Sequence, residues 1–177
     1  ASDVYKRQIQ LSGDFGYQFN HREEWSAFHT HYDTQMMPAK DPDRELVFKL
    51  HTFSSSLKLR LFNSSSWEHM AGWNMQIQKN AIGGYSFLLP EYKRFTTGAF
   101  WLTTFRLDNQ LSVTGGIRYD RGRIDIAAFE DPYLVEYLHR QGYEEEVIQA
   151  YRWRSYPVDR AYGCLLYTSP SPRDISG

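Results

Sequence analysis

The 177-residue chain has little of what several protein classes need. Its single cysteine, Cys164, excludes a disulfide framework and a cysteine-based zinc site. A formal net charge of −1 gives no electrostatic case for nucleic-acid binding, which needs a clustered basic surface. The sequence contains no run of 18 apolar residues, so it predicts no transmembrane helix. It also lacks a basic start followed by an apolar run, which is the pattern of a signal peptide.

The common catalytic motifs are also missing. The sequence has no phosphate-binding P-loop, no G-x-S-x-G and no H-E-x-x-H. The adjacent carboxylates Glu23 and Glu24 would point to opposite faces of a strand, so they do not form a glycosidase pair by themselves. We therefore expect no catalytic residues, no enzyme activity and no cofactor.

Aromatic residues, by contrast, are abundant. The chain has 13 Tyr, 11 Phe and 5 Trp, yet its mean hydropathy is −0.60. Many aromatics in a polar background indicate surfaces of alternating character rather than one large core. The combination fits outer-membrane barrels and carbohydrate-binding β-sandwiches alike.

The two ends of the chain are related at the level of DNA. One DNA sequence that encodes residues 3–8 has a reverse complement that, in another frame, encodes residues 164–169. The pair matches the translation of a transposon-end sequencing adapter; the alternative is coincidence. We therefore expect residues 1–8 and 164–177 to be adapter-derived, non-native and without function, and residues 164–177 to have little order. Residues 9–163 are then an internal segment of a longer protein.

Long stretches of the remaining sequence alternate strictly between apolar and polar residues. From Ile9 to Phe19 the odd positions are apolar or glycine, and the even positions are polar or glycine. Similar patterns predict further strands within 46–62, 66–80, 96–107 and 111–120. Soluble strands usually run five or six residues, whereas a tilted membrane strand needs about 9–11.

The connections between these strands differ in length in a regular way. Short turns at 63–65 and 108–109 alternate with long loops at about 26–44, 81–94 and 125–160. The last loop contains a helical pattern, with Asp131 as the N-cap, Pro132 in the first turn and Gly142 between two short helices. Membrane barrels have short turns at one end and long loops at the other.

In most of the strands the charged residues occupy the same alternate positions as the other polar residues, so they lie on one face of the strand. A barrel wall between lipid and lumen requires this arrangement. In the second strand the parity of the apolar residues changes, which we ascribe to a bulge near His51. The polar parity predicts a set of lumen-facing residues: Gln18, Asn20, Arg22, Asn74, Gln76, Gln78, Arg118 and Asp120.

Several stretches together resemble the TonB-dependent outer-membrane receptors of Bacteroidota-type bacteria. These are GYQFNHREEW, LVFKLHTFSSSLKLRLF, WEHMAGWNMQIQKNAIGGYSFLLPEYKRFTTGAFWL and QLSVTGGIRYD, in that order. The resemblance covers residues 9–120 well and extends loosely to residue 163. It implies an all-β fold, in which about five long antiparallel up-and-down strands form an arc of a 22-stranded transmembrane barrel with a short helical extracellular loop.

The resemblance also implies a function and a location. The whole receptor would sit in the outer membrane and import a scarce ligand such as siderophore-bound iron, haem, cobalamin or a glycan. Its partners would be membrane lipid, the plug domain of the same chain and, through that plug, the TonB energy-coupling protein. The plug and the coupling segment lie outside this sequence. The alternatives are a passive porin-like barrel and a soluble carbohydrate-binding β-sandwich.

Candidate ligand contacts come from aromatic residues of the long loops, because exposed rings stack on sugars and on siderophore rings. We single out Tyr32, Tyr85, Phe87, Tyr92 and Trp153. His29 and His31 are weak candidates for metal ligands, because alternate residues of an extended segment share a face. A solvated polar loop is the preferred interpretation of this pair, so we expect no metal site.

Overall fold

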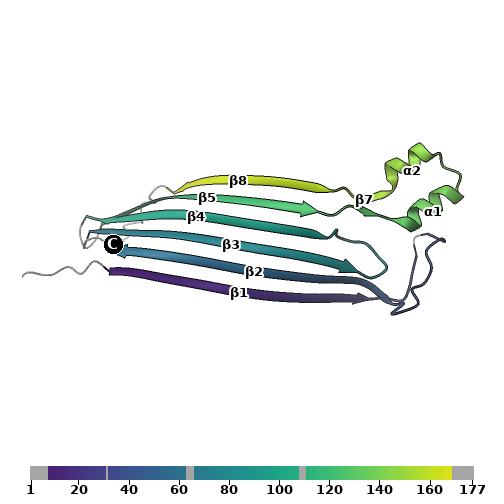
Figure 1. The fold of residues 1–177 in the computed structure, drawn as a ribbon, viewed down its shortest axis with the longest axis horizontal. Helices are drawn as coiled ribbons and strands as arrows, with labels where there is room; N and C mark the ends of the chain where they lie inside the picture. The colour runs from purple at the N-terminus through teal and green to yellow at the C-terminus, as the bar shows by residue number, and fades with distance from the viewer. Residues whose placement is uncertain (1–7, 31, 63–65, 108–110, 169–177) are drawn as a thin grey trace, which may run out of the picture.

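A six-stranded antiparallel sheet dominates the computed structural model, which describes residues 8–30, 32–62, 66–107 and 111–168. Neighbouring strands in the sheet follow the order β1-β2-β3-β4-β5-β8 (Figure 1). Their bounds are β1 Gln8–Trp25, β2 Arg44–Phe62, β3 Trp67–Gly83, β4 Tyr92–Arg106, β5 Ser112–Ile126 and β8 Val158–Thr168. The all-β, up-and-down prediction is therefore confirmed, and strands β1–β5 are the five that the alternation predicts.

Two short helices lie in the long connection between β5 and β8. They are α1 (Pro132–Arg140) and α2 (Glu145–Tyr151), flanked by a two-stranded ribbon of β6 (Phe129–Glu130) and β7 (Trp153–Ser155). The Asp131 side chain accepts hydrogen bonds from the first two free backbone amides of α1, as an N-cap does. Gly142, with φ of +78°, allows the tight turn between the helices. Neither helix is long and apolar enough to cross a membrane, in the part of the chain that the structure describes.

All the long connections lie at one end of the sheet, which we call the loop end; the opposite end is the turn end. The loop-end connections are residues 26–43, 84–91 and 127–157 (Figure 1). They are shorter than the sequence predicts, because β3, β4 and β5 extend further toward this end than the clear alternation does. The predicted turns at 63–65 and 108–109 both lie outside the described residues.

Strand β8 corrects two predictions. Val158–Thr168 pairs along β5, where the sequence predicts loop up to residue 160 and little order from residue 164. The physical reason is that β5 presents an open edge whose N–H and C=O groups accept any extended neighbour. The Leu-Leu-Tyr-Thr segment that ends β8 is made of residues that fit a strand. Residues 169–177 lie outside the described part.

The predicted bulge near His51 is wrong. The ladder between β1 and β2 runs without interruption through His51, and its register shifts only between Glu24 and Trp25. The change of parity in β2 is therefore real: Leu46, Phe48 and Leu50 lie on the side of the sheet opposite to Phe53. The sheet exchanges its apolar and polar sides near the loop end.

The two sides of the sheet differ in chemistry and in exposure. We call them the Trp73 face and the Asn74 face, after two consecutive residues of β3. Every exposed large apolar side chain of β2–β5 lies on the Trp73 face. They are Phe53, Leu57, Trp67, Trp73, Ile77, Phe95, Trp101, Val113, Ile117 and Tyr119. The polar Asn74 face is half-buried by contrast, so the arrangement is the reverse of that in a water-soluble sheet.

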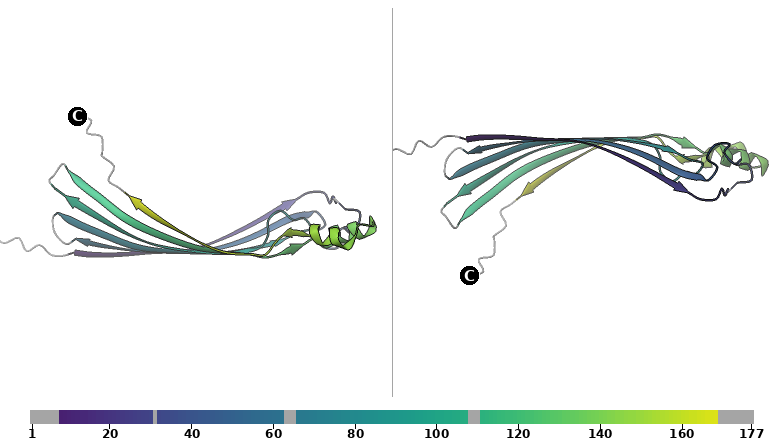
Figure 2. Two further views of the ribbon diagram at one scale, coloured as in Figure 1. Left: turned by 90° about the horizontal axis from the view of Figure 1, so that it is seen from above. Right: turned by 90° about the horizontal axis from the view of Figure 1, so that it is seen from below.

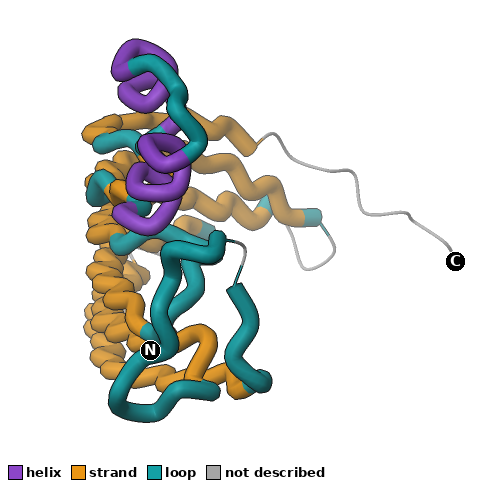
Figure 3. The backbone as a smooth tube through the Cα atoms, turned by 90° about the vertical axis from the view of Figure 1, so that its right-hand side faces the viewer, coloured by secondary structure: helices purple, strands orange, loops and turns teal. Residues whose placement is uncertain are grey.

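The sheet forms a single twisted layer, and the loops and helices gather at its loop end (Figures 2 and 3). Among the described residues no second sheet covers the Trp73 face. The buried hydrophobic side chains of the described residues are only Leu46, Val47 and Ile148. These side chains belong to the loop end of β2 and to α2, so the middle of the sheet has no core of its own.

Candidate functional site

The three loops at the loop end hold one another by specific contacts. We call them the first loop (residues 26–43), the second loop (84–91) and the helical loop (127–157). The Gln35 side-chain amide donates a hydrogen bond to the carbonyl oxygen of Tyr85 at 2.9 Å. The hydroxyl of Thr34, which is buried, donates to the carbonyl oxygen of Tyr133 at 2.8 Å. The first loop is thus tied both to the second loop and to the helical loop.

An aromatic pair links the second loop to the helical loop directly. The rings of Phe87 and Phe129 stack with centroids 4.3 Å apart and planes inclined by 13°. The Tyr85 ring meets the Phe28 ring edge-on at 5.0 Å, which adds a further contact to the first loop. Such pairs contribute about 0.5–1.5 kcal/mol each beyond their area burial. The three loops therefore form one connected cluster.

A cavity of about 400 Å³ lies inside this loop cluster. Its lining is rich in aromatic rings and contains one acidic and one basic side chain. The lining residues are Tyr32, Gln35, Tyr85, Ser86, Phe87, Phe129, Asp131, Tyr133 and Arg154. The volume falls in the range of small-molecule sites, and rings beside a few polar groups are the usual composition of such sites.

Arg154 is the charged centre of the cavity. Its guanidinium donates hydrogen bonds to the Tyr32 hydroxyl and, at 3.3 Å, to the Asp131 carboxylate. The same guanidinium lies 5.8 Å from the centroid of the Tyr32 ring. Because Asp131 offsets the charge of Arg154, the site has no strong net charge. The arrangement suits a neutral polar ligand that offers flat surfaces to the rings and hydroxyls to the amide and guanidinium groups.

The structure brings together three of the five predicted ligand contacts. Tyr32, Tyr85 and Phe87 line the cavity, one from the first loop and two from the second. Tyr92 does not lie on a loop: it is the first residue of β4 and lines a separate cavity. Trp153 is in β7, where the Arg152 guanidinium sits 5.3 Å from its ring centroid.

Arg152 belongs to an ion pair that fixes the base of the helical loop. Its guanidinium donates to the Glu130 carboxylate at 2.7 Å, and this hydrogen bond raises the pKa of Arg152. The backbone amide of Asp131 also donates to the carbonyl oxygen of Arg152 at 3.2 Å. Trp153 therefore supports the helical loop and does not line the loop-cluster cavity.

The histidine pair is only partly described. His31 falls outside the described residues. His29 lies beside the second loop, where its ring contacts the Tyr85 ring at 6.0 Å and its Nε2 is 3.7 Å from the Glu45 carboxylate. In the described ranges, no group of three or more His, Cys, Asp or Glu side chains could hold a metal ion.

The eight residues predicted to face a lumen all lie on the Asn74 face. Three of them form one polar cluster across two strands. The Arg118 guanidinium binds both carboxylate oxygens of Asp120, at 2.6 and 2.7 Å, and reaches the Asn74 side-chain oxygen at 3.4 Å. Gly98 of β4 lies between them in register, and a Cβ atom there would be 2.1 Å from an Asp120 oxygen. The glycine leaves the space in which the cluster forms.

Sequence reasoning missed six lining residues of the loop cavity: Gln35, Ser86, Phe129, Asp131, Tyr133 and Arg154. Phe129 and Tyr133 have the same signal as Tyr32, Tyr85 and Phe87, since they are aromatic residues of a long loop and flank the predicted N-cap. Nothing local in the sequence marks Arg154, because its contact with Tyr32 joins positions 122 residues apart.

Replacing Arg154 by alanine is expected to loosen the loop cluster. The change removes both the bond to Tyr32 and the bond to Asp131, so the first loop should open more often. We expect proteolytic cleavage within residues 26–43 to become several-fold faster, measured by limited proteolysis of the folded protein. Arg140→Ala is the matched control, because in the described part of the chain the ion pair of Arg140 is with Glu136 on the same exposed helix. Equal cleavage rates in the two variants would contradict a tying role for Arg154.

Comparison of the chain with family models, with curated proteins and with solved structures finds no match. The function is therefore inferred from the sequence pattern and from the geometry of the sheet and its loops.

Proposed function

We propose that the chain is an arc of the wall of a 22-stranded outer-membrane barrel, in a receptor of the TonB-dependent type. The observation that carries the proposal is the inverted exposure of the sheet: its apolar Trp73 face is the exposed one. Leu11 and Phe15 are each 71% exposed, and Trp101 is 47% exposed. A continuous apolar surface of this size needs a covering, and lipid is the covering that a barrel wall has.

On each of the five strands β1–β5 the apolar band is followed, toward the loop end, by a nitrogen-bearing side chain. On the Trp73 face, the large apolar residue that ends the band toward the loop end is Phe19, Phe53, Ile77, Phe95 or Tyr119, for β1 to β5; two apolar side chains lie beyond it, Trp25 of β1 and the buried Val47 of β2. At the next position on that face each of these strands has a histidine, a lysine or an arginine. We call these residues the basic row: His21, His51, Lys79, Lys93 and Arg121. The boundary is where an apolar environment would give way to water.

This boundary is level across β2, β3 and β4, where His51, Lys79 and Lys93 are opposite one another, and is displaced in opposite directions at β1 and β5. Arg121 of β5 is level in register with Phe15 of β1, whereas the basic row reaches β1 at His21, six residues further along. Six residues span about 20 Å and four strand spacings span about 19 Å, so the line from Arg121 to His21, taken between the two outer strands, makes an angle of about 45° with the strands. Strands of outer-membrane barrels tilt by about 35–45°.

The height of the band also fits a membrane. In β4 the band runs from Phe95 to Phe105. Ten residue steps cover about 33 Å along the strand, which a tilt of about 45° reduces to about 23 Å. Outer-membrane barrels carry an apolar band about 25 Å tall.

Beyond the basic row the two faces exchange character. On the Asn74 face the loop-end positions are mostly apolar: Leu46, Phe48, Leu50, Ile82, Tyr92, Ile124 and Ile126. The Trp73 face carries Glu23, Lys49, Arg123 and Asp125 there, together with the apolar Trp25 and Val47. This is the polarity of a sheet whose outside meets water, and it supports a wall that projects from the membrane at the loop end.

In this proposal the loop cluster lies outside the cell and captures a small-molecule ligand, and the protein transports without catalysis. The plug domain and its TonB contact belong to parts of the receptor beyond this sequence, and residues 1–8 and 164–177 derive from the adapter. The resemblance to TonB-dependent receptors favours an active transporter over a passive porin-like barrel. The single-layer sheet favours a membrane barrel of either kind, active or passive, over a soluble β-sandwich, which has two packed sheets.

The proposal is tested on the complete gene product that contains residues 9–163. We expect it in the outer-membrane fraction, with gel migration that changes on heating, as folded barrels show. The 177-residue chain alone is expected not to be a folded monomer in aqueous buffer, because both edges of its sheet and its apolar face are uncovered. A soluble, monomeric, folded chain would refute a barrel wall and support the sandwich.

A further inference from the structure

We propose that His29 is a proton-controlled tie that regulates access to the loop-cluster cavity. The inference rests on the proposed function, because it assigns a regulation to the cavity in which the receptor captures its ligand. When the imidazole takes up a proton, it binds the Glu45 carboxylate of β2 and holds the first loop closed. When the imidazole loses that proton, the contact is lost and the first loop opens more often.

The first reason is the position of the hydrogen on the neutral His29 ring. The Nδ1 atom lies 3.2 Å from the carbonyl oxygen of Ala27. A carbonyl oxygen only accepts hydrogen bonds, so Nδ1 must be the nitrogen that donates. In the neutral ring the other nitrogen, Nε2, then carries a lone pair and has no hydrogen to donate.

The second reason is that this Nε2 atom faces an acceptor. It lies 3.7 Å from the Oε1 atom of the Glu45 carboxylate, which is too long for a hydrogen bond. Two acceptors do not bind each other, so the neutral ring gains nothing from Glu45. A proton on Nε2 converts the pair into a charge-assisted hydrogen bond, and a movement of about 1 Å brings it to the length of such bonds.

The third reason is that Glu45 has no other counter-ion. Among the described residues, His29 is the only basic side chain within 4.0 Å of this carboxylate. The adjacent Arg44 is engaged by Asp41 at 3.2 Å instead. The side chain of Glu45 is only 22% exposed, so its charge gains from a cation beside it.

Glu45 also connects the first loop to the lining of the cavity. Its Oε2 atom accepts from the Ser26 hydroxyl at 2.7 Å, and that hydroxyl lies 3.2 Å from the Tyr85 hydroxyl. The backbone carbonyl oxygen of Glu45 accepts from the Ser86 amide at 3.0 Å. Tyr85 and Ser86 both line the cavity. The tie at His29 is therefore one link in a network that reaches the proposed ligand site.

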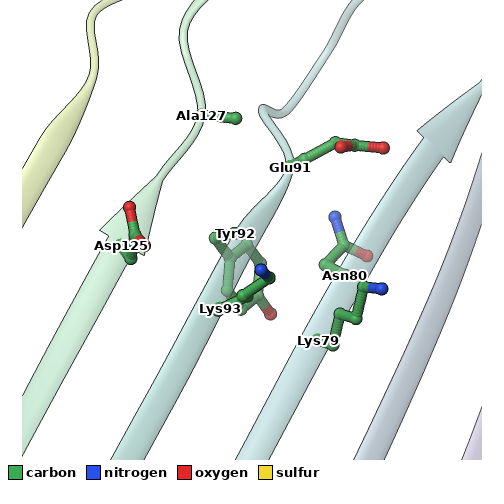
Figure 4. A pocket seen from close by; sticks show the side chains of 7 residues that line it. All are labelled: Lys79, Asn80, Glu91, Tyr92, Lys93, Asp125 and Ala127. Carbon is green, nitrogen blue, oxygen red and sulfur yellow. The ribbon is translucent and has the colours of Figure 1, made fainter.

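The second loop is anchored at both of its ends and does not depend on His29. At its start, the backbone lies so close to β2 that a Cβ atom at Gly84 would be 2.2 Å from the Glu45 carbonyl oxygen. At its end, the Glu91 carboxylate accepts from the Ile82 amide at 3.2 Å. Figure 4 shows the Glu91 side chain reaching from the start of β4 toward β3. The first loop is therefore the part that moves when the tie is lost.

The groups around His29 leave histidine as the one that titrates near neutral pH. In the described part of the chain it is faced by Glu45 and, from the second loop, by the Tyr85 hydroxyl, which lies 3.4 Å from Nδ1. Asp43, at the end of the same loop, accepts from the Phe28 backbone amide at 3.2 Å. Carboxylic acids ordinarily titrate near about pH 4 and tyrosine near about pH 10, whereas histidine titrates between about pH 5 and 8. The tie therefore forms as the pH falls through this range and is lost as the pH rises.

The experiment measures proteolytic cleavage within residues 26–43 of the complete, folded gene product at about pH 5.5 and about pH 8. Each rate is divided by the cleavage rate of a synthetic peptide of residues 26–43 at the same pH, which removes the pH dependence of the protease. We compare the wild type with His29→Gln, with Glu45→Gln and with the matched control His139→Gln. His139 also faces a carboxylate, that of Glu145 at 3.9 Å, but this pair lies in the helical loop.

We expect the corrected rate to be about two- to fivefold higher at the higher pH in the wild type and in His139→Gln, the range of an exposed ion pair. In His29→Gln and in Glu45→Gln the two rates should be equal. The Glu45→Gln variant keeps an oxygen for the Ser26 hydroxyl, so it isolates the charge. Equal rates in the wild type, or a pH dependence that persists in His29→Gln or disappears in His139→Gln, would overturn the inference.

Heat-modifiable migration separates the two proposals. Its absence in the wild type refutes the proposed function and this regulation with it. Its presence in all four proteins, together with equal rates in the wild type at the two pH values, refutes the regulation alone.

Discussion

Arginine at position 57 is expected to destabilise the folded receptor by about 2–4 kcal/mol, the cost of a basic side chain facing lipid near the middle of the membrane. Leu57 lies on the Trp73 face, opposite Trp73 in register and well inside the apolar band. The measurement is a urea titration of the complete gene product in phospholipid vesicles. The folded fraction is read from the migration of unheated samples. Such a loss lowers the folding equilibrium constant by a factor of about 30 to 1,000.

The neighbouring residue supplies the control. Ser56 sits one position away in β2, at the same depth, but on the Asn74 face, where its hydroxyl donates to the Asp14 carboxylate at 3.2 Å. Arginine at position 56 can meet Asp14 and the polar side chains around it, so we expect a change within about 0.5 kcal/mol. If Ser56→Arg proved as harmful as Leu57→Arg, the two faces would not differ in environment and the barrel wall would be refuted.

Alanine at position 98 is expected to cost about 1–3 kcal/mol, the second largest effect that the sheet predicts. The added Cβ atom would lie 2.1 Å from an Asp120 carboxylate oxygen and 2.9 Å from the Asn74 side-chain oxygen. Asp120 must therefore turn away, which breaks its two hydrogen bonds with Arg118 and leaves that guanidinium half-buried without its carboxylate. The same urea titration measures the loss.

Gly115→Ala is the control for this change, because a Cβ atom at Gly115 meets nothing within 4 Å. Replacing glycine in a strand without a clash stabilises by up to about 1 kcal/mol through the unfolded chain. The Asp120→Ala background separates the causes further. If Gly98→Ala costs as much there as in the wild type, the loss comes from the backbone rather than from the polar cluster.

The sequence predicts the strands well where alternation is strict and both faces differ in polarity. It places β1–β5 and the parity of all eight predicted polar residues correctly, since a period of two depends only on local order. It misses β8, whose first half contains the adjacent charges Asp159 and Arg160 and lacks clear alternation. That strand is selected by the open edge of β5, which is a tertiary property.

The incorrect prediction of a bulge near His51 also results from a property that local sequence does not show. The parity change at Leu46, Phe48 and Leu50 looks like an inserted residue if one face is assumed to stay apolar along the whole strand. The ladder shows that the environment changes instead of the register. For the loop cavity, composition identifies Tyr32 and Phe87 as exposed loop aromatics. It cannot reveal that Arg154 returns across the helical loop to meet Tyr32, because that depends on how two loops fold toward each other.

The exchange of polarity between the two faces determines how deeply the proposed wall sits in the membrane. Sliding the wall inward by two residues would carry Lys79 and Lys93 into hydrocarbon. Sliding it outward would lift Ile77 and Phe95 into water. Each displacement places side chains of several strands in the wrong solvent at once. The free energy of the wall therefore rises steeply when the wall moves up or down from its preferred position in the membrane. A segment of wall with this pattern sets its own height in the bilayer, and the loops above it are held at a fixed distance from the membrane surface.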